Sequence, residues 1–281
     1  MDQQESMEPS PLGQSEISGQ RLCPLCGSMR RGFLFRRNDS ELVECAECTM
    51  VFVGNECTYE TQVADYDWPA SYLRERARRE REYPVLLFLS GLVRRLKSEM
   101  ADRLLGQTLR WKQGGKLVDL GCADGAFLAK CARHFEAIGV EISPQLVERA
   151  RQRLPAAILL GPVTQVPLPE NAFDVVTQFG YLEHEWHPLG ALRVAQRALK
   201  PGGITVIKVP NYASWNRRVL GQAWSGYRLP DHCNYFTPQT LGRMLIQAGL
   251  RPLRRSLLDR LPTSDTLWMA AEKPLEGVSR H

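Results

Sequence analysis

The sequence lacks any apolar run long enough to cross a membrane. Its longest apolar stretch, PVLLFLSGLV at residues 84–93, is too short for a spanning helix. Residues 1–20 are polar and have no apolar core, so we predict a disordered tail and not a secretion signal. No internal repeat is visible. We therefore expect a cytoplasmic protein without membrane contact.

A strong excess of charge of one sign is also missing. The net charge is +5, and 43% of the 281 residues are hydrophobic and 24% charged, which is ordinary for a globular protein. The charge alone gives no reason to expect a nucleic-acid partner. The length predicts one core domain with a small appendage. Residues 58–115 are expected to form a linker and a helical extension, where the mixed charges of SYLRERARRERE favour a solvated helix face.

The eight cysteines are unevenly distributed, since five of them fall between residues 23 and 57. Such clustering is typical of an intracellular metal site and not of a secreted disulfide framework. Four of them form two Cys-x-x-Cys pairs with eighteen residues between the pairs: Cys23, Cys26, Cys45 and Cys48. Four thiolates in this spacing predict a closed, structural Zn²⁺ site. We expect residues 21–57 to form a zinc ribbon, with Cys57 as a spare thiol.

From residue 116 onward, short apolar runs alternate with segments of helical periodicity. The runs that predict strands are KLVDL, EAIGVEI, AAILL, FDVVTQ and GITVIKV. PQLVERARQRL and PLGALRVAQRAL lie between strands and predict helices. Strict alternation of strand and helix predicts an α/β fold, in which helices cover both faces of a doubly wound, mostly parallel sheet.

A glycine loop follows the first of these strands, in VDLGCADGAF at residues 118–127. Gly121 and Gly125 do not fit the G-x-G-x-x-G spacing, and no Gly-Lys-Ser/Thr follows as in a P-loop. Asp119 would repel a phosphate at this loop and attract a cation. Glu141 lies 20 residues after Gly121, where an acid accepts hydrogen bonds from ribose hydroxyls. These features predict S-adenosylmethionine, which carries a sulfonium and an ammonium group but no phosphate.

Several motifs resemble those of class I S-adenosylmethionine-dependent methyltransferases over residues 116–272. VDLGCADGAF resembles the first motif of that family and GVEIS the second. VPLPENAFDVVTQFGYLEH resembles the stretch through the fourth strand, and LKPGGITVIKVPN the fifth strand. DHCNYFTPQTLGRMLIQAGL resembles the segment that follows in a large subgroup acting mainly on small molecules. The resemblance implies a seven-stranded Rossmann-like methyltransferase fold, with residues 273–281 as a tail.

The resemblance also implies a set of cofactor-binding residues. The methionine end is expected to contact Asp119, Gly121, Cys122 and Gly125. Glu141 and Ile142 are expected to hold the ribose and one face of the adenine, and Phe179 is added to the predicted contacts. Pro162 stands where the family often has an aspartate, so we expect Val163 to take over adenine recognition through its backbone and apolar packing.

Two histidines are candidates for removing the proton of a hydroxyl acceptor. Methyl transfer is an in-line displacement, and a hydroxyl nucleophile usually needs a positioned base. His184 follows the fourth strand and His232 follows the fifth, so both are expected at the ligand end of the sheet. His232 is the slightly favoured base because it lies within an aromatic segment expected to cover the acceptor. His187 is expected to cap the next helix.

That aromatic segment, residues 211–236, predicts a substrate lid over an aromatic, apolar or anionic small molecule. The favoured function is O-methylation of a sugar or natural-product hydroxyl. C-methylation of a nucleotide sugar and a non-catalytic scaffold stay open as alternatives. A further alternative is methylation of ribosomal or other RNA, in which the ribbon docks on RNA. Against RNA, TQFGYLEH lacks the Asn/Asp-Pro-Pro-aromatic signature of many amino-group methyltransferases.

Overall fold

A computed structural model gives the fold of the chain and describes residues 19–37, 39–55, 77–78, 81–82, 100–154, 157–253 and 264–275. Several sequence predictions concern residues outside these ranges. They are the N-terminal tail up to residue 18, the apolar stretch 84–93, Cys57 and most of the extension 58–115.

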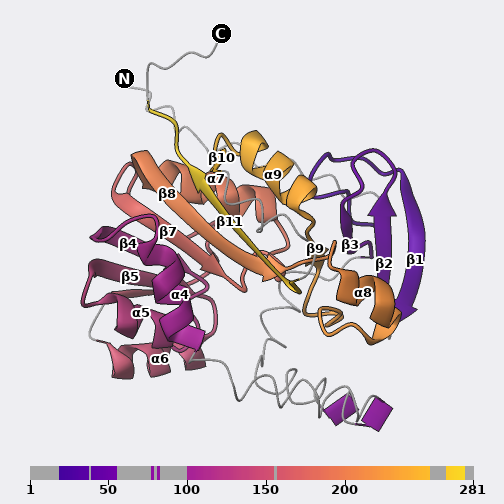
Figure 1. Cartoon of the computed structure of the whole chain (residues 1–281), viewed down its shortest axis with the longest axis horizontal. Coiled ribbons are helices and arrows are strands. Elements are labelled where there is room, and N and C mark those ends of the chain that lie inside the picture. The colour runs from indigo at the N-terminus through magenta and orange to yellow at the C-terminus, as the bar shows by residue number, and fades with distance from the viewer. Residues whose placement is uncertain are drawn as a thin grey trace, which may run out of the picture.

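The larger sheet has seven strands in the order β10-β11-β8-β7-β4-β5-β6 (Figure 1). Their bounds are β4 Gly115–Leu120, β5 Phe135–Glu141, β6 Ile158–Leu160, β7 Phe173–Phe179, β8 Leu199–Pro210, β10 Arg251–Leu253 and β11 Thr266–Glu272. Neighbouring strands from β6 to β8 are parallel, whereas β11 is antiparallel to both β8 and β10. The predicted α/β fold with a mostly parallel, seven-stranded sheet is confirmed.

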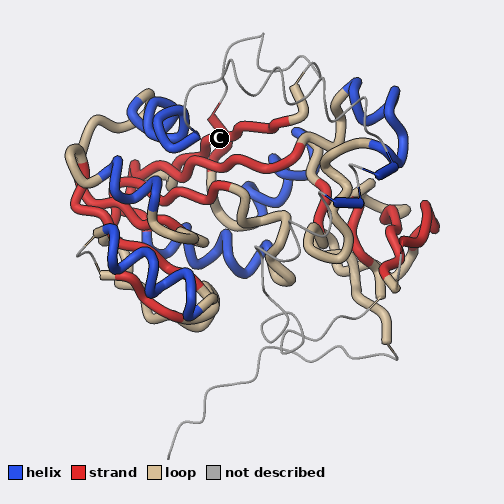
Figure 2. The backbone as a smooth tube through the Cα atoms, turned by 90° about the horizontal axis from the view of Figure 1, so that it is seen from below, coloured by secondary structure: helices blue, strands red, loops and turns tan. Residues whose placement is uncertain are grey.

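Helices cover both faces of this sheet (Figure 2). The helices α4 Met100–Leu109, α5 Ala126–Cys131 and α6 Pro144–Arg153 cover one face, and α7 Pro188–Ala198 and α9 Pro238–Gln247 cover the other. Each face has its own apolar core, because the strands are buried on both sides. Helix α9 begins at a capping box. The Thr237 hydroxyl accepts a hydrogen bond from the Thr240 N–H, and the Thr240 hydroxyl accepts one from the Thr237 N–H.

The N-terminal residues form a second, small antiparallel sheet. It contains β1 Arg31–Arg37, β2 Ser40–Cys45 and β3 Val51–Val53, and its fourth strand is β9 Asn234–Tyr235. In the register of this sheet, Val51 lies opposite Tyr235 and Phe52 opposite Asn234. The ribbon is therefore joined to the larger domain through a shared sheet, and Figure 1 shows β1–β3 beside β9 and α8 Trp215–Leu220.

Strands β2 and β3 of the small sheet are buried against the larger domain on both faces. Val43 and Phe52 belong to the same apolar core as Met244 of α9. Leu42 and Val51 pack on the opposite side with the aromatic segment that follows β8. That segment includes α8 and the short 3₁₀ helix η1 Gly221–Ala223.

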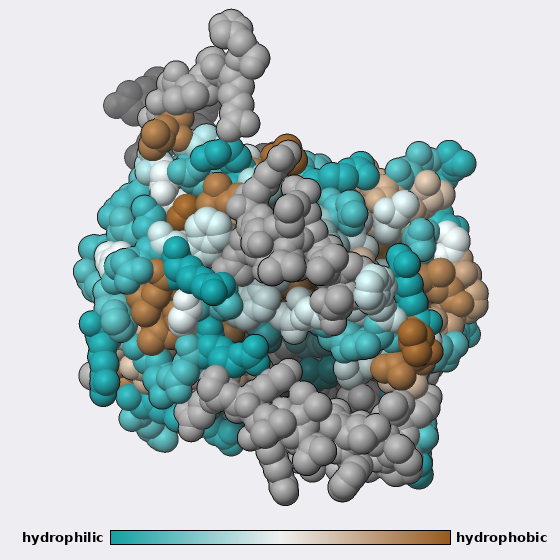
Figure 3. Space-filling view, viewed as in Figure 1, coloured by the Kyte–Doolittle hydropathy of each residue, from teal (hydrophilic) through white to brown (hydrophobic). Residues whose placement is uncertain are grey.

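The visible surface is mainly hydrophilic, with separate hydrophobic groups (Figure 3). One such group lies at the edge where Figure 1 draws β1, and the exposed residues of that strand include Phe33 and Leu34. Among the described residues, no helix combines the length and apolarity needed to span a membrane.

Candidate active site

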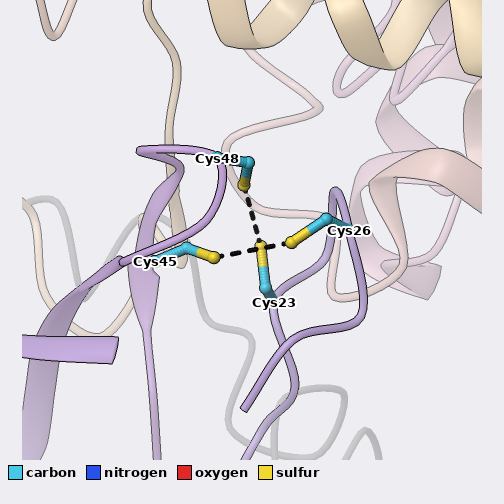
Figure 4. Close-up of side chains that lie close together, drawn as sticks. All are labelled: Cys23, Cys26, Cys45 and Cys48. Carbon is cyan, nitrogen blue, oxygen red and sulfur yellow. Dashed lines mark hydrogen bonds between the residues drawn. The ribbon is translucent and has the colours of Figure 1, made fainter. Parts of the chain in front are cut away.

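Four cysteine thiols meet at one end of the small sheet (Figure 4). The Sγ atoms of Cys23 and Cys48 are 3.4 Å apart and those of Cys26 and Cys45 are 3.5 Å apart. All four lie within 4.8 Å of one another. Tetrahedral zinc with Zn–S bonds of about 2.3 Å requires sulfur separations of about 3.8 Å. The thiols predicted from the Cys-x-x-Cys spacing are thus arranged as a metal site requires.

Arg21 ties this ribbon to the larger domain. Its side chain is buried and donates hydrogen bonds to the carbonyl oxygens of Cys233 and Trp186 and to the Asn234 Oδ1. Its guanidinium also lies 4.0 Å from the centre of the Trp186 ring. Sequence reasoning missed Arg21, because nothing local marks a single arginine as buried.

The glycine loop lies at the carboxyl end of β4 and needs glycine at both predicted positions. Gly121 and Gly125 have φ angles of 76° and 73°, in the left-handed region that side chains rarely adopt. A Cβ atom on Gly121 would stand 2.8 Å from Cδ2 of Tyr181, and one on Gly125 would stand 3.0 Å from the Cβ of Ala150. The glycines therefore let α5 approach α6 and let the loop after β7 approach the loop after β4.

Asp119 is a buried carboxyl group at the end of β4. It accepts a hydrogen bond of 2.6 Å from the Thr177 hydroxyl on the neighbouring β7. Burial raises the pKa of Asp119 to about 7, against the opposing effect of the Thr177 bond and with a further rise from the nearby Glu141. A cation bound beside Asp119 would favour its charged form.

Glu141 ends β5 and holds two loops together. One carboxylate oxygen accepts the N–H of Ala123 in the glycine loop, at 2.9 Å. The other accepts the N–H groups of Ile142 and Ser143, each at 2.9 Å. A carboxylate has about four acceptor positions, so these three bonds leave about one for a ligand. Burial raises the pKa of Glu141, and the three N–H donors lower it.

The remaining predicted cofactor residues differ in what their side chains face. The Cys122 thiol points into the core, since a Cβ on Gly139 would stand 2.5 Å from its Sγ atom. Its side chain is therefore not open to a ligand. Val163 is buried, while Ile142 is partly exposed. The Phe179 ring packs edge-on against Phe127 of α5, at a centroid distance of 5.0 Å, and is partly exposed.

His184 and His232 lie side by side beyond the carboxyl end of β7. Their rings meet edge to face with centroids 4.7 Å apart. Nδ1 of His184 lies 2.8 Å from the Asp231 carbonyl oxygen, and Nδ1 of His232 lies 2.8 Å from that of Gly226. Burial lowers the pKa of His184 to about 4, and burial also lowers the pKa of His232 well below its usual range. His232 is 4% exposed, whereas His184 is partly exposed and so the nearer of the two to solvent.

Glu183 completes this cluster and was not predicted as a site residue. It is 4% exposed, and its Oε2 atom is buried without a hydrogen-bond partner. Its carbonyl oxygen accepts the N–H groups of Cys233 and Asn234 at 2.8 and 3.1 Å, which joins the loop after β7 to the segment before β9. The available signal was its position directly before His184 in YLEHEW.

The aromatic segment 211–236 is largely used to bind the ribbon. Four of its rings form a cluster of mainly edge-to-face contacts that packs with Leu42 and Val51: Tyr212, Trp224, Tyr227 and Tyr235. These rings are 1–8% exposed, so they are core side chains and are not free to close over a ligand. His187 is the N-cap residue of α7, as expected, although its side chain makes no capping bond.

Comparison with known proteins identifies the larger domain. Residues 92–254, more than half of the chain, match the family described as "Methyltransferase domain". The chain belongs to this methyltransferase domain family. The seven-stranded domain is thus a class I S-adenosylmethionine-dependent methyltransferase domain, as the sequence motifs indicated.

Curated relatives include methyltransferases named for oxygen acceptors. This chain is 33% identical over 172 residues to a malonyl-[acyl-carrier protein] O-methyltransferase from Serratia marcescens, covering 60% of this chain and 64% of that protein. It is 28% identical over 186 residues to a ubiquinone biosynthesis O-methyltransferase from Cereibacter sphaeroides, covering 62% of this chain and 74% of the relative. The chain thus matches slightly less than two thirds of the Serratia protein.

Solved structures support the fold. A SAM-dependent methyltransferase from Archaeoglobus fulgidus superposes with a TM-score of 0.51 at 19% identity, covering 62% of this chain and 92% of that one. An S-adenosylmethionine-dependent methyltransferase from Mesorhizobium loti gives a TM-score of 0.50 at 20% identity, with 61% and 97% covered. At this identity the likeness concerns the arrangement of helices and strands alone.

Proposed function

We propose that this methyltransferase transfers a methyl group to a hydroxyl oxygen of a small molecule, with a sugar or natural-product hydroxyl as the acceptor class. The observation that carries the proposal is the contact between His184 and His232 beyond the carboxyl end of β7. A hydroxyl acceptor must lose a proton during transfer, and a pair of imidazoles beside the acceptor is suited to promoting that loss. Relatives named as O-methyltransferases support oxygen as the methylated atom.

The residues around the glycine loop fit S-adenosylmethionine, which supplies a methyl group bonded to a positively charged sulfur. The Asp119 carboxylate attracts the ammonium group, and Gly121 and Gly125 shape the loop by letting Tyr181 and Ala150 pack closely against it. Glu141 uses its remaining acceptor position for a ribose hydroxyl. Two buried carboxylates at one loop favour a cation without phosphate, which excludes a dinucleotide on electrostatic grounds.

The adenine side of this proposed site is mainly apolar. Ile142 follows Glu141 directly, and Val163 stands in the loop after β6. The side chains of Ile142 and Val163 lie against the adenine, while Phe179 at the end of β7 lies against the methionine part of the cofactor. Cys122 contributes backbone only, because its thiol lies in the core.

The acceptor lies on the far side of the methyl group, next to the histidines. His184 faces the acceptor because it is the more exposed ring, and buried His232 stands behind it. Holding the hydroxyl oxygen in line with the methyl carbon supplies much of the rate acceleration. Arg217 and Arg228 in the segment after β8 offer positive charge for an anionic group of the acceptor.

The four-cysteine cluster binds a structural Zn²⁺ in this proposal. Four thiolates fill a tetrahedral shell and leave no position for a substrate. The ion orders the turns that precede β1 and β3, and these strands pack on the aromatic segment and on α9. Zinc thus acts at a distance, by holding the scaffold that positions His232.

The test is methyl transfer from radiolabelled S-adenosylmethionine to a panel of small-molecule hydroxyl acceptors. With an acceptor identified, His184→Ala and His232→Ala should each lower turnover by about 100-fold or more while cofactor affinity stays unchanged. His134→Ala is the matched control, because His134 is exposed and lies after α5, and it should keep full activity. Undiminished turnover in both histidine variants would overturn the assignment of the acceptor side.

A further inference from the structure

Glu183, His184 and His232 present the ligand set of a divalent metal site. Glu183 and His184 follow β7, whereas His232 comes from the segment before β9. One ligand atom of each residue lies within 4.8 Å of the other two. Among the described residues, the four cysteines are the other cluster with this property. The two clusters differ in chemistry, since this one offers nitrogen and oxygen where the other offers sulfur.

The buried Glu183 carboxylate is the strongest sign that this cluster binds a ligand. A buried carboxylate oxygen without a partner is costly, and proteins usually pair such a group or use it to coordinate a metal. Here Oε2 has no hydrogen-bond partner although the main chain of the same residue is bonded twice to the β9 segment. The backbone is thus held in place while a carboxylate oxygen is left unpaired at the cluster.

Both imidazoles are oriented as metal ligands are. A backbone carbonyl only accepts hydrogen bonds, so Nδ1 of His184 donates to Asp231 and Nδ1 of His232 donates to Gly226. In a neutral ring the lone pair is then on Nε2. An Nδ1–H bond to a backbone carbonyl is the usual second contact of a metal-binding histidine, because it fixes the ring and its tautomer.

We propose that Glu183, His184 and His232 bind one divalent transition-metal ion through a carboxylate oxygen and two imidazole nitrogens. Two histidines and one carboxylate leave coordination positions open, as in catalytic and not in closed structural sites. The role of the ion rests on the proposed O-methyl transfer, because the open positions bind the acceptor hydroxyl.

The metal ion lowers the pKa of the hydroxyl that it binds, so the proton is released to solvent water. The alkoxide oxygen then forms a bond to the methyl carbon. The bond between that carbon and the sulfonium sulfur breaks, and the sulfur keeps the electron pair. His184 and His232 act in this step as ligands that place the metal and thereby the acceptor oxygen.

The charges around the cluster set its affinity. Burial raises the pKa of Glu183, and the positive charges of Lys208 and Arg228 oppose that rise because they stabilise its charged form. Asp231 lies 3.4 Å from the Arg228 guanidinium and offsets part of that charge. Lys208 therefore opposes a bound cation, which gives an informative variant: Lys208→Met should tighten metal binding by a few fold.

The experiment is a titration of the zinc-loaded full-length protein with Co²⁺, followed by visible absorption and calorimetry. One equivalent of Co²⁺ should bind and give the weak d–d bands of nitrogen and oxygen ligands. A thiolate charge-transfer band would reveal any Co²⁺ that has entered the cysteine site. Glu183→Gln keeps the shape of the side chain and should weaken Co²⁺ binding by at least about 100-fold. Even the loss of a group that only hydrogen-bonds to a metal ligand typically lowers metal affinity by about 10–100-fold. Glu170→Gln, on the exposed turn before β7, is the matched control.

Each result decides the proposal. Loss of the Co²⁺ bands in Glu183→Gln and in His184→Asn, with tighter binding in Lys208→Met, supports the site. No binding at millimolar Co²⁺, or binding that Glu183→Gln leaves unchanged, overturns it.

If chelation leaves methyl transfer intact while the histidine variants lose turnover, the metal site fails and the proposed function stands. If Co²⁺ binds as expected but no hydroxyl is methylated, the proposed function fails and the metal site stands.

Discussion

Replacing Glu141 by alanine should destabilise the cofactor-free protein, because this carboxylate is a structural clamp as well as a proposed ribose contact. It accepts three backbone N–H bonds, each of 2.9 Å. The Ser143 donor is buried, and leaving it unpaired costs about 1–3 kcal/mol. The N–H groups of Ala123 and Ile142 are only partly buried, so water can replace the lost carboxylate. Losing each of these two hydrogen bonds therefore costs about 0.5–1.5 kcal/mol at most.

Relief of the unfavourable burial of the carboxylate offsets part of this loss. We therefore expect Glu141→Ala to lower the free energy of unfolding by about 2–4 kcal/mol. Urea denaturation without cofactor measures it. Among folded molecules, S-adenosylmethionine should in addition bind about 1–3 kcal/mol more weakly, as calorimetry would detect.

Glu148→Ala is the matched control for this prediction. Glu148 is a glutamate on the neighbouring helix α6, but it is exposed, so its loss should change stability by less than about 0.5 kcal/mol. The stability of Glu141→Gln should be intermediate, because the amide keeps one oxygen that accepts hydrogen bonds. Its NH₂ group, however, points at a backbone N–H, and two donors cannot form a hydrogen bond. A Glu141→Ala protein as stable as the wild type would refute the clamp, and unchanged cofactor affinity would refute the ribose contact.

Three further predictions concern the cofactor loop and the ribbon. Since burial raises the pKa of Asp119 to about 7, above about 3.9 in the unfolded chain, this group should lower cofactor-free stability as the pH rises from about 4 to about 7. Between about pH 6 and about pH 8 the affinity for S-adenosylmethionine should rise, because Asp119 loses its proton and then attracts the cation. Calorimetry at these two pH values measures the rise, and Asp119→Asn should abolish it. Purified protein should contain one tightly held zinc ion per chain, and zinc-free, reduced wild-type protein would contradict this. Cys45→Ser should release the zinc ion and expose the amides of Asn234 and Tyr235 to hydrogen exchange, while S-adenosylmethionine still binds. NAD should show no calorimetric binding, and measurable affinity would mean that the loop accepts phosphate beside Asp119 and Glu141.

Local patterns predicted the parallel part of the larger sheet well, because each of its inner strands is an apolar run followed by a helix. KLVDL, FDVVTQ and GITVIKV fall within β4, β7 and β8, and the fold class follows from their alternation with helices. The four cysteines were equally readable, since their spacing alone fixes which thiols meet.

Contacts between distant segments were not predictable in this way. Strand β9 has two residues, too few for any periodicity, and its pairing with β3 depends on the tertiary structure. The same contact turns aromatic residues of the expected lid, such as Trp224, into a core against the ribbon. Glu183 was overlooked because its unpaired oxygen is a property of burial, which the letters YLEHEW do not reveal.

The shared sheet also imposes an order on synthesis. Phe52 leaves the ribosome about 180 residues before its partner Asn234, which at about 5–20 residues per second is a delay of about 10–40 s. Throughout that interval the edge of β3 has no fourth strand, and Leu42, Val51 and Val53 have no aromatic cover. A nascent ribbon, even one with a metal ion bound, therefore presents an open strand edge and an apolar face to its surroundings until the end of the methyltransferase domain emerges.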